Sequence, residues 1–117
     1  MKDINGEIQY RGKTLKLVFN LNVMERIQEE YGSLDNWGNL TDGTANNGEP
    51  SAKAVTFGFM EMLNEGIDIE NEENGTETPF FTQRQVGRII TEYGLQNATR
   101  VLNETVIDST ESTEKNG

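Results

Sequence analysis

Residues 51–63 read SAKAVTFGFMEML, and this stretch decides how the rest of the chain can fold. With successive residues 100° apart around a helix, five apolar side chains fall in one stripe that is typical of a core-facing surface: Ala52, Val55, Phe59, Met62 and Leu63. Phe57 and Met60 fall outside that stripe, so the helix is apolar on more than one side. We therefore expect either a central helix covered on two faces or a helix with a second surface for a partner.

The segment before this helix predicts a β-hairpin over residues 4–19. Apolar residues alternate with polar ones on both sides of a turn that contains Gly12, at Ile8, Tyr10, Leu15, Leu17 and Phe19. Two strands alone are only marginally stable in water. We therefore expect helices to cover the apolar face of this hairpin.

A first helix is predicted over residues 21–31, with Gly32 placed to end it. Its start is ambiguous, because Asn20 and Asn22 both fit the N-cap position. Ser33 to Trp37 then predicts a short helical turn whose Leu34 and Trp37 side chains face inwards.

Three further helices are predicted at 51–65, 82–93 and 95–107. The clearest start is Thr82, which has Gln85 three residues later in a capping-box pattern and Phe81 before it as a hydrophobic staple. Between the first two lie residues 66–78, which are acidic and poor in large apolar side chains, so they predict a mobile loop. A calcium-binding loop starting at Glu70 fails, because Phe81 occupies the position of the bidentate glutamate.

Length and composition predict one domain over residues 1–108 with an α+β, mainly α fold, in which the hairpin packs on about four helices. Of the 117 residues, 33% are hydrophobic and 26% are charged. Residues 109–117 contain no apolar side chain, and we expect them to form a disordered tail.

The net charge of −10 disfavours binding to nucleic acid or to anionic membranes, because phosphate groups are bound by clustered Lys and Arg. We expect no membrane span, since no run of about 18 apolar residues occurs, and no signal peptide. The chain has no Cys, which fits an intracellular protein without disulfides.

The residue types also bear on catalysis. Without His or Cys, the chain lacks His-based triads, thiol nucleophiles and the usual zinc ligands. Its carboxylates fall on polar helix faces or in the acidic segment, where nothing is expected to shift their pKa towards neutrality. We therefore expect no catalytic residue, no cofactor and no metal site. Arg84 and Arg88 lie four residues apart on one helix, so they point together as a candidate partner-binding pair.

The order of the elements carries a resemblance. A hairpin and first helix, INGEIQYRGKTLKLVFNLNVMERIQEEYG, are followed by the apolar helix SAKAVTFGFMEMLNEG, an acidic segment, a capped helix that opens FTQRQVGRII, and a final helix. This pattern over residues 4–107 is similar to the small tail assembly chaperones of long-tailed bacteriophages, particularly those of Gram-positive hosts. No fixed binding motif accompanies the pattern, and the long acidic segment is a departure from it.

The resemblance implies a non-enzymatic protein of the host cell cytoplasm that is absent from the mature virion. Such a protein binds the tape measure protein, keeps it soluble until the tail tube polymerises, and self-associates; the tail tube protein is a second candidate partner. The candidate client-binding residues are Phe57 and Met60, with core packing as the alternative role, together with the Arg84–Arg88 pair. Two other functions stay open: a virion structural tail or connector protein, and an acidic DNA-mimic inhibitor.

Overall fold

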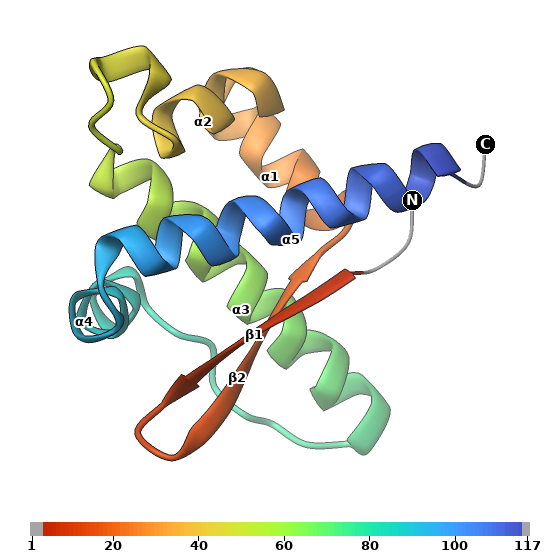
Figure 1. Ribbon diagram of the computed structural model, residues 1–117. Helices are drawn as coiled ribbons and strands as arrows, with labels where there is room; N and C mark the ends of the chain where they lie inside the picture. The colour runs from red at the N-terminus through yellow and green to blue at the C-terminus, as the bar shows by residue number, and fades with distance from the viewer. Residues whose placement is uncertain (1–3, 116–117) are drawn as a thin grey trace.

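A computed structural model of the protein describes the backbone of residues 4–115 and the side-chain surroundings of residues 6–107. Figure 1 shows the elements in chain order, which are β1 (Ile4–Tyr10), β2 (Lys13–Phe19), α1 (Leu21–Tyr31), α2 (Leu34–Thr41), the short 3-10 helix η1 (Thr44–Asn46), α3 (Ala52–Asn74), α4 (Gln83–Tyr93) and α5 (Leu95–Lys115). This order confirms the predicted α+β, mainly α fold with an N-terminal hairpin.

The hairpin is antiparallel, with Gly6 opposite Leu17 and Ile8 opposite Leu15. Its two turn residues, Arg11 and Gly12, both have positive φ values, of 51° and 77°. That combination matches the twist of the flanking strands and closes the shortest kind of hairpin.

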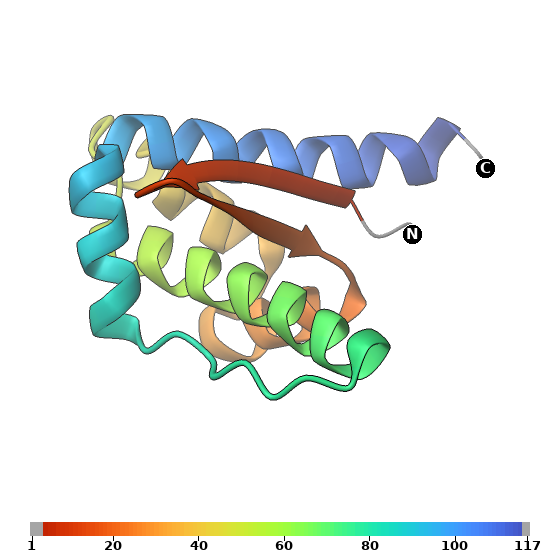
Figure 2. The same ribbon diagram turned by 90° about the horizontal axis from the view of Figure 1, so that it is seen from below.

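The hairpin lies between α5 and α3, as Figure 2 shows, with β1 against α5 and β2 against α3. Glycine allows both of these close contacts. A Cβ atom on Gly6 would collide with the Thr105 hydroxyl in α5, and one on Gly66 in α3 would lie 3.2 Å from the carbonyl oxygen of Lys16. The two helices therefore cover the hairpin at close backbone distance.

Helix α3 is the centre of the core. The stripe predicted from the sequence is buried at Val55, Phe59, Met62 and Leu63, whereas Ala52 at the start of α3 is exposed. Trp37 in α2 is 1% exposed, which confirms that it faces inwards.

The helix ends follow the capping signals. Asn20, rather than Asn22, caps α1, and its side chain accepts a hydrogen bond of 3.3 Å from the backbone N–H of Val23. The capping box at α4 is complete: the Thr82 side chain accepts from the Gln85 N–H at 3.2 Å, and the Gln85 side chain accepts from the Thr82 N–H at 2.8 Å. The predicted start of this helix is therefore confirmed.

The prediction of a loop over residues 66–78 is wrong for most of its length. Helix α3 continues through Gly66 to Asn74 and ends at Gly75, whose φ is 65°. Gly66 does not end the helix because it packs against β2, and Ile67 is half-buried one residue later. A few such contacts suffice to extend a helix that is already nucleated.

The prediction of a disordered tail over residues 109–117 also differs from the structure, because the backbone of α5 is helical to Lys115. No Gly or Pro occurs between Leu95 and Lys115, so no helix-breaking residue interrupts a helix whose Ala98 and Leu102 are buried in the core. Residues 116 and 117 lie outside the described part of the chain.

Candidate partner-binding groove

The outward side of α3 carries the two residues singled out from the sequence. Phe57 and Met60 are both half-buried and pack against the edge of the core. The Phe57 ring meets the ring of Tyr31 in α1 edge to face, with 5.5 Å between the ring centroids. Neither residue is thus a fully buried core position or a freely exposed one.

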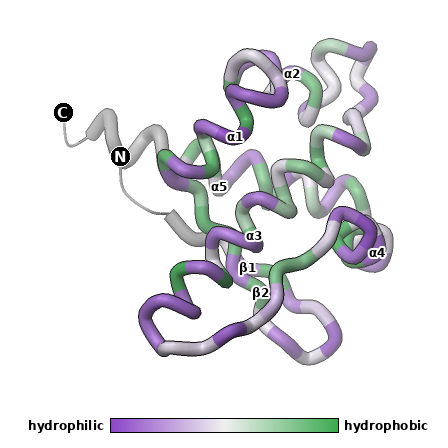
Figure 3. Tube along the Cα trace, turned by 180° about the vertical axis from the view of Figure 1, so that it is seen from behind, coloured by the Kyte–Doolittle hydropathy of each residue, from purple (hydrophilic) through white to green (hydrophobic). Residues whose placement is uncertain are grey.

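Seen from behind in Figure 3, α3 crosses the molecule between α1 and α4, and the chain from Gly75 to Thr82 passes its C-terminal half. A cavity of about 220 Å³ opens between α1 and α3 on this side; we call it the α1–α3 groove, and its lining residues are Asn22, Val23, Arg26, Glu61, Asn64, Glu65, Asp68 and Phe80. The exposed side of α3 therefore runs from an apolar part at Phe57 and Met60 to a polar part in the groove.

The groove carries more negative than positive charge, since it contains the carboxylates of Glu61, Glu65 and Asp68. Its one lining cation is Arg26, whose Nε lies 3.7 Å from a carboxylate oxygen of Glu61. Burial raises the pKa of the Glu61 carboxyl; Arg26 acts in the opposite direction, and Glu65 adds to the rise. The charge of Glu61 is therefore only partly compensated.

Glu65 is held in place from α1. One of its carboxylate oxygens accepts hydrogen bonds from the side-chain amides of Asn20, at 2.7 Å, and Asn22, at 3.1 Å. The two amides tie the start of α1 to α3, and they provide dipoles but no positive charge. Asn22, which the sequence offered as an N-cap, is instead part of this tie.

Two asparagine side chains of α3 hold the segment that follows the helix. Asn64 donates to the carbonyl oxygen of Phe81 at 3.1 Å and accepts from its N–H at 2.8 Å. Asn71, two helical turns further on, makes the same pair of bonds to Thr78, both at 3.0 Å. Each amide thus bonds to the backbone much as a neighbouring strand would, and the segment is fixed along α3.

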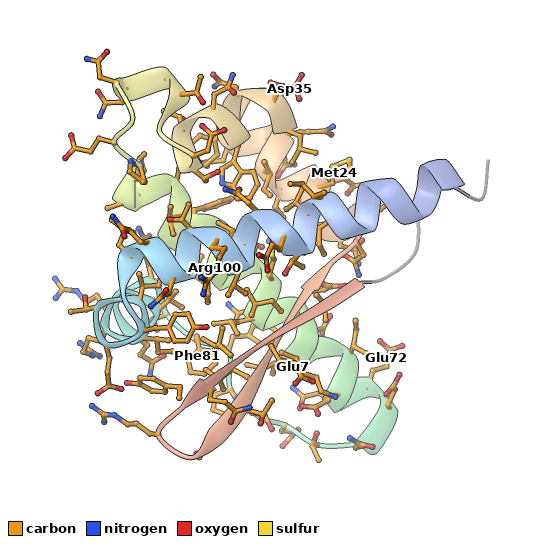
Figure 4. All side chains as sticks on the ribbon, viewed as in Figure 1. Glu7, Met24, Asp35, Glu72, Phe81 and Arg100 are labelled. Carbon is orange, nitrogen blue, oxygen red and sulfur yellow. The ribbon has the colours of Figure 1, made fainter. Side chains whose placement is uncertain are left out.

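This attachment sets the directions of two neighbouring aromatic rings. Phe81 turns inwards, packs against the core and lies near α4 and the hairpin, as Figure 4 shows. Phe80 lines the α1–α3 groove with 54% of its surface exposed. The backbone that carries this exposed phenyl ring is therefore held on both sides of Phe80, next to the carboxylates.

The other candidate pair lies elsewhere. Arg84 and Arg88 are exposed on α4, and within residues 6–107 neither makes a hydrogen bond or a salt bridge. They do not line the α1–α3 groove. The structure therefore does not join this pair to Phe57 and Met60 in one site.

Neither the groove nor the role of Phe80 was predicted from the sequence. The hydrophobic pattern of α3 gives no sign of the groove, because the α3 residues that line it are all polar and resemble an ordinary solvated helix face. The available signal was the pair Asn64 and Asn71, seven residues apart, on a helix that was expected to end between them.

Two features, a metal site and a membrane-spanning helix, are absent from the described residues. In that part of the chain no group of three or more Asp or Glu side chains is placed to hold a metal ion. Among the same residues, no helix has the length and apolarity needed to cross a membrane. Comparison of the chain with protein-family models, with curated proteins and with solved structures finds no significant match.

Proposed function

We propose that this chain is a non-enzymatic tail assembly chaperone of a long-tailed bacteriophage. It binds the tape measure protein in the host cell cytoplasm, keeps it soluble before the tail tube polymerises, and is left out of the mature virion. The proposal starts from the resemblance in element order, and self-association and contact with the tail tube protein belong to it as further expected interactions.

The observation that carries the proposal is the placement of Phe57 and Met60. Both are half-buried on the outward side of α3, next to a groove that runs along the helix. An amphipathic helix binds such a surface through apolar residues spaced three or four apart. Methionine suits variable contacts because its side chain is unbranched and polarizable.

The charge of the chain supports the same function. A net charge of −10 keeps a complex with an aggregation-prone client soluble, and it favours clients with basic residues. Helix–groove contact and high charge together are what a holding chaperone for a long helical protein requires.

Co-expression with the tape measure protein of the same phage tests the proposal. The fraction of that protein in the soluble lysate is measured with the natural chain, with Met60→Ser, and with Phe57→Ser combined with Met60→Ser. Leu95→Ser is the matched control, because Leu95 is a partly exposed leucine at the start of α5, away from the groove.

The natural chain and the Leu95→Ser control should keep the client soluble, and the Met60 and double variants should not. Truncation of two fully buried side chains of this size costs about 5–10 kcal/mol, so roughly half of that is expected for two half-buried ones. Urea unfolding of each purified variant shows whether the fold survives, and Met60→Ser serves as the milder test. Client that stays soluble with the double variant would show that the site is wrong. Presence of the chain in purified virions would favour the structural-protein alternative.

A further inference from the structure

We propose that the α1–α3 groove binds a Lys or Arg side chain of a partner helix, about two helical turns away from the apolar residue that contacts Phe57 and Met60. The inference rests on the proposed function for the identity of the partner, the tape measure protein. The chemistry of the groove itself suits an amphipathic helix with this spacing of one apolar and one basic residue.

Charge complementarity is the first argument. Glu61, Glu65 and Asp68 line one cavity, and Arg26 is the single cation among its lining residues. Arg26 is also shared, because a second nitrogen of its guanidinium lies 3.8 Å from Glu29 outside the groove. The groove therefore keeps negative charge that a further cation would neutralise.

Because Glu61 is partly buried, neutralising its charge stabilises a complex more than the same ion pair would at an open surface. Its side chain is 21% exposed, so its interaction with a nearby cation is screened less than that of a fully solvated pair. A partner that buries the groove without bringing a cation would remove water from Glu61 and leave its charge uncompensated, which is unfavourable.

The exposed ring of Phe80 offers the same cation a second favourable contact. A cation over the face of an aromatic ring is attracted by the ring's negative π surface. The exposed Phe80 ring lines the same cavity as the carboxylates, and Asn64 and Asn71 fix the backbone on which it sits. Because this backbone is already held, less conformational freedom is lost when a partner contacts Phe80, which favours its use as a contact.

The spacing follows from helix geometry. Phe57 and Asp68 lie eleven residues apart in α3, or about 16 Å at 1.5 Å per residue. The middle of the apolar pair and the middle of the three carboxylates are about six residues apart, which corresponds to about 9 Å. A partner helix lying along α3 therefore places its basic residue about six positions from its apolar anchor, and about seven is the nearest spacing that keeps both residues on one face of the helix.

Two synthetic helical peptides test the inference. Both are based on alanine and glutamine and carry one Leu; the first carries Lys seven residues after the Leu, and the second carries Gln there. Binding is followed by NMR shift changes in the full-length protein. The Lys peptide should bind roughly threefold to thirtyfold more tightly at low salt, as expected for one exposed ion pair and one cation–π contact. The difference should shrink at high salt.

Variants of the protein locate the contact. Asp68→Asn should remove much of the preference for the Lys peptide, and Phe80→Leu should reduce it, since leucine keeps the apolar contact without the aromatic face. Glu72→Gln is the matched control, because Glu72 is exposed on α3 and does not line the groove. All three positions are exposed, so these variants should fold normally.

Equal binding of the two peptides at low salt, or a preference that survives Asp68→Asn and Phe80→Leu, would overturn the inference. The outcome is separate from that of the proposed function. If the Lys peptide binds as expected but the tape measure protein stays insoluble, the chaperone function fails and the groove stands. If the client is kept soluble while the peptides are bound equally, the function stands and the basic anchor is wrong.

Discussion

Of the two glycines inside α3, Gly58 should tolerate an added methyl group less well than Gly66. A Cβ atom there would overlap the Trp37 ring, with Cζ2 in direct collision, Cε2 at 3.1 Å and Nε1 at 3.3 Å. The ring cannot move away cheaply, because it is 1% exposed and its Nε1–H donates a 3.0 Å hydrogen bond to the carbonyl oxygen of Ala54.

The expected change in the free energy of unfolding for Gly58→Ala combines one stabilising and two destabilising contributions. Alanine normally stabilises a helix interior by about 1 kcal/mol relative to glycine. Overpacking a core costs about 1–3 kcal/mol, and displacing the indole would leave a buried donor unpaired at a further cost of about 1–3 kcal/mol. The net prediction is a loss of about 1–5 kcal/mol in the free energy of unfolding.

Urea unfolding followed by Trp37 fluorescence measures this change, since Trp37 is the only tryptophan in the chain. Gly87→Ala is the matched control: Gly87 lies inside α4, and a Cβ atom there meets no atom within 4 Å. That variant should be as stable as the natural chain or more stable by up to about 1 kcal/mol. A Gly58→Ala protein that gains stability as Gly87→Ala does would refute the packing of α2 on α3.

Three further changes test local parts of the structure by urea unfolding. Thr82→Ala should cost about 1 kcal/mol, because it removes the hydroxyl that accepts the hydrogen bond from the Gln85 N–H. An unchanged urea midpoint would mean that this bond contributes nothing to stability. Tyr31→Phe should leave the free energy of unfolding unchanged or raise it by up to about 1 kcal/mol, because the buried Tyr31 hydroxyl has no hydrogen-bond partner within residues 6–107. A clear loss of stability would contradict that placement of the hydroxyl. Glu61→Gln should raise the urea midpoint at pH 7, because the pKa of Glu61 is higher in the folded protein than its usual 4.5 and the natural chain therefore loses stability as pH rises from 4.5 through that raised pKa. Below pH 4.5 the carboxyl is neutral in both states, so the variant should lose this advantage. A lower midpoint at pH 7 would mean that the Arg26 ion pair outweighs the effect of burial.

Local signals in the sequence predicted most of the fold because they depend on neighbouring residues alone. The alternation at Leu15, Leu17 and Phe19, the turn at Gly12 and the capping box at Thr82 each contain the groups that make the structure. The buried stripe of α3 was predicted for the same reason, since helix geometry fixes which residues share a face.

The second half of α3 could not be predicted in this way. Residues 67–74 are acidic and contain little to bury, and Gly66 before them looks like a helix end. What keeps this part helical is tertiary: the close contact of Gly66 with β2 and the two bonds from Asn71 to Thr78. Composition alone does not report such contacts.

The candidate site was predicted only in part, for a related reason. The excess of apolar residues on α3 identified Phe57 and Met60, but their exposure depends on how closely α1 and α4 approach α3. The groove beside them is made by residues from three segments, with Phe80 brought in by the bonds between Asn64 and Phe81. Pairings between such distant residues leave no periodic trace in a single sequence.

Sedimentation of the tape measure protein, made with and without this chain, tests the proposed chaperone function itself. We predict that the tape measure protein made alone is found in the insoluble pellet. Made together with this chain, it should stay in the supernatant and co-migrate with the chain through a gradient. If the tape measure protein pellets equally in both cases, or stays soluble but migrates apart from this chain, then this chain is not its chaperone.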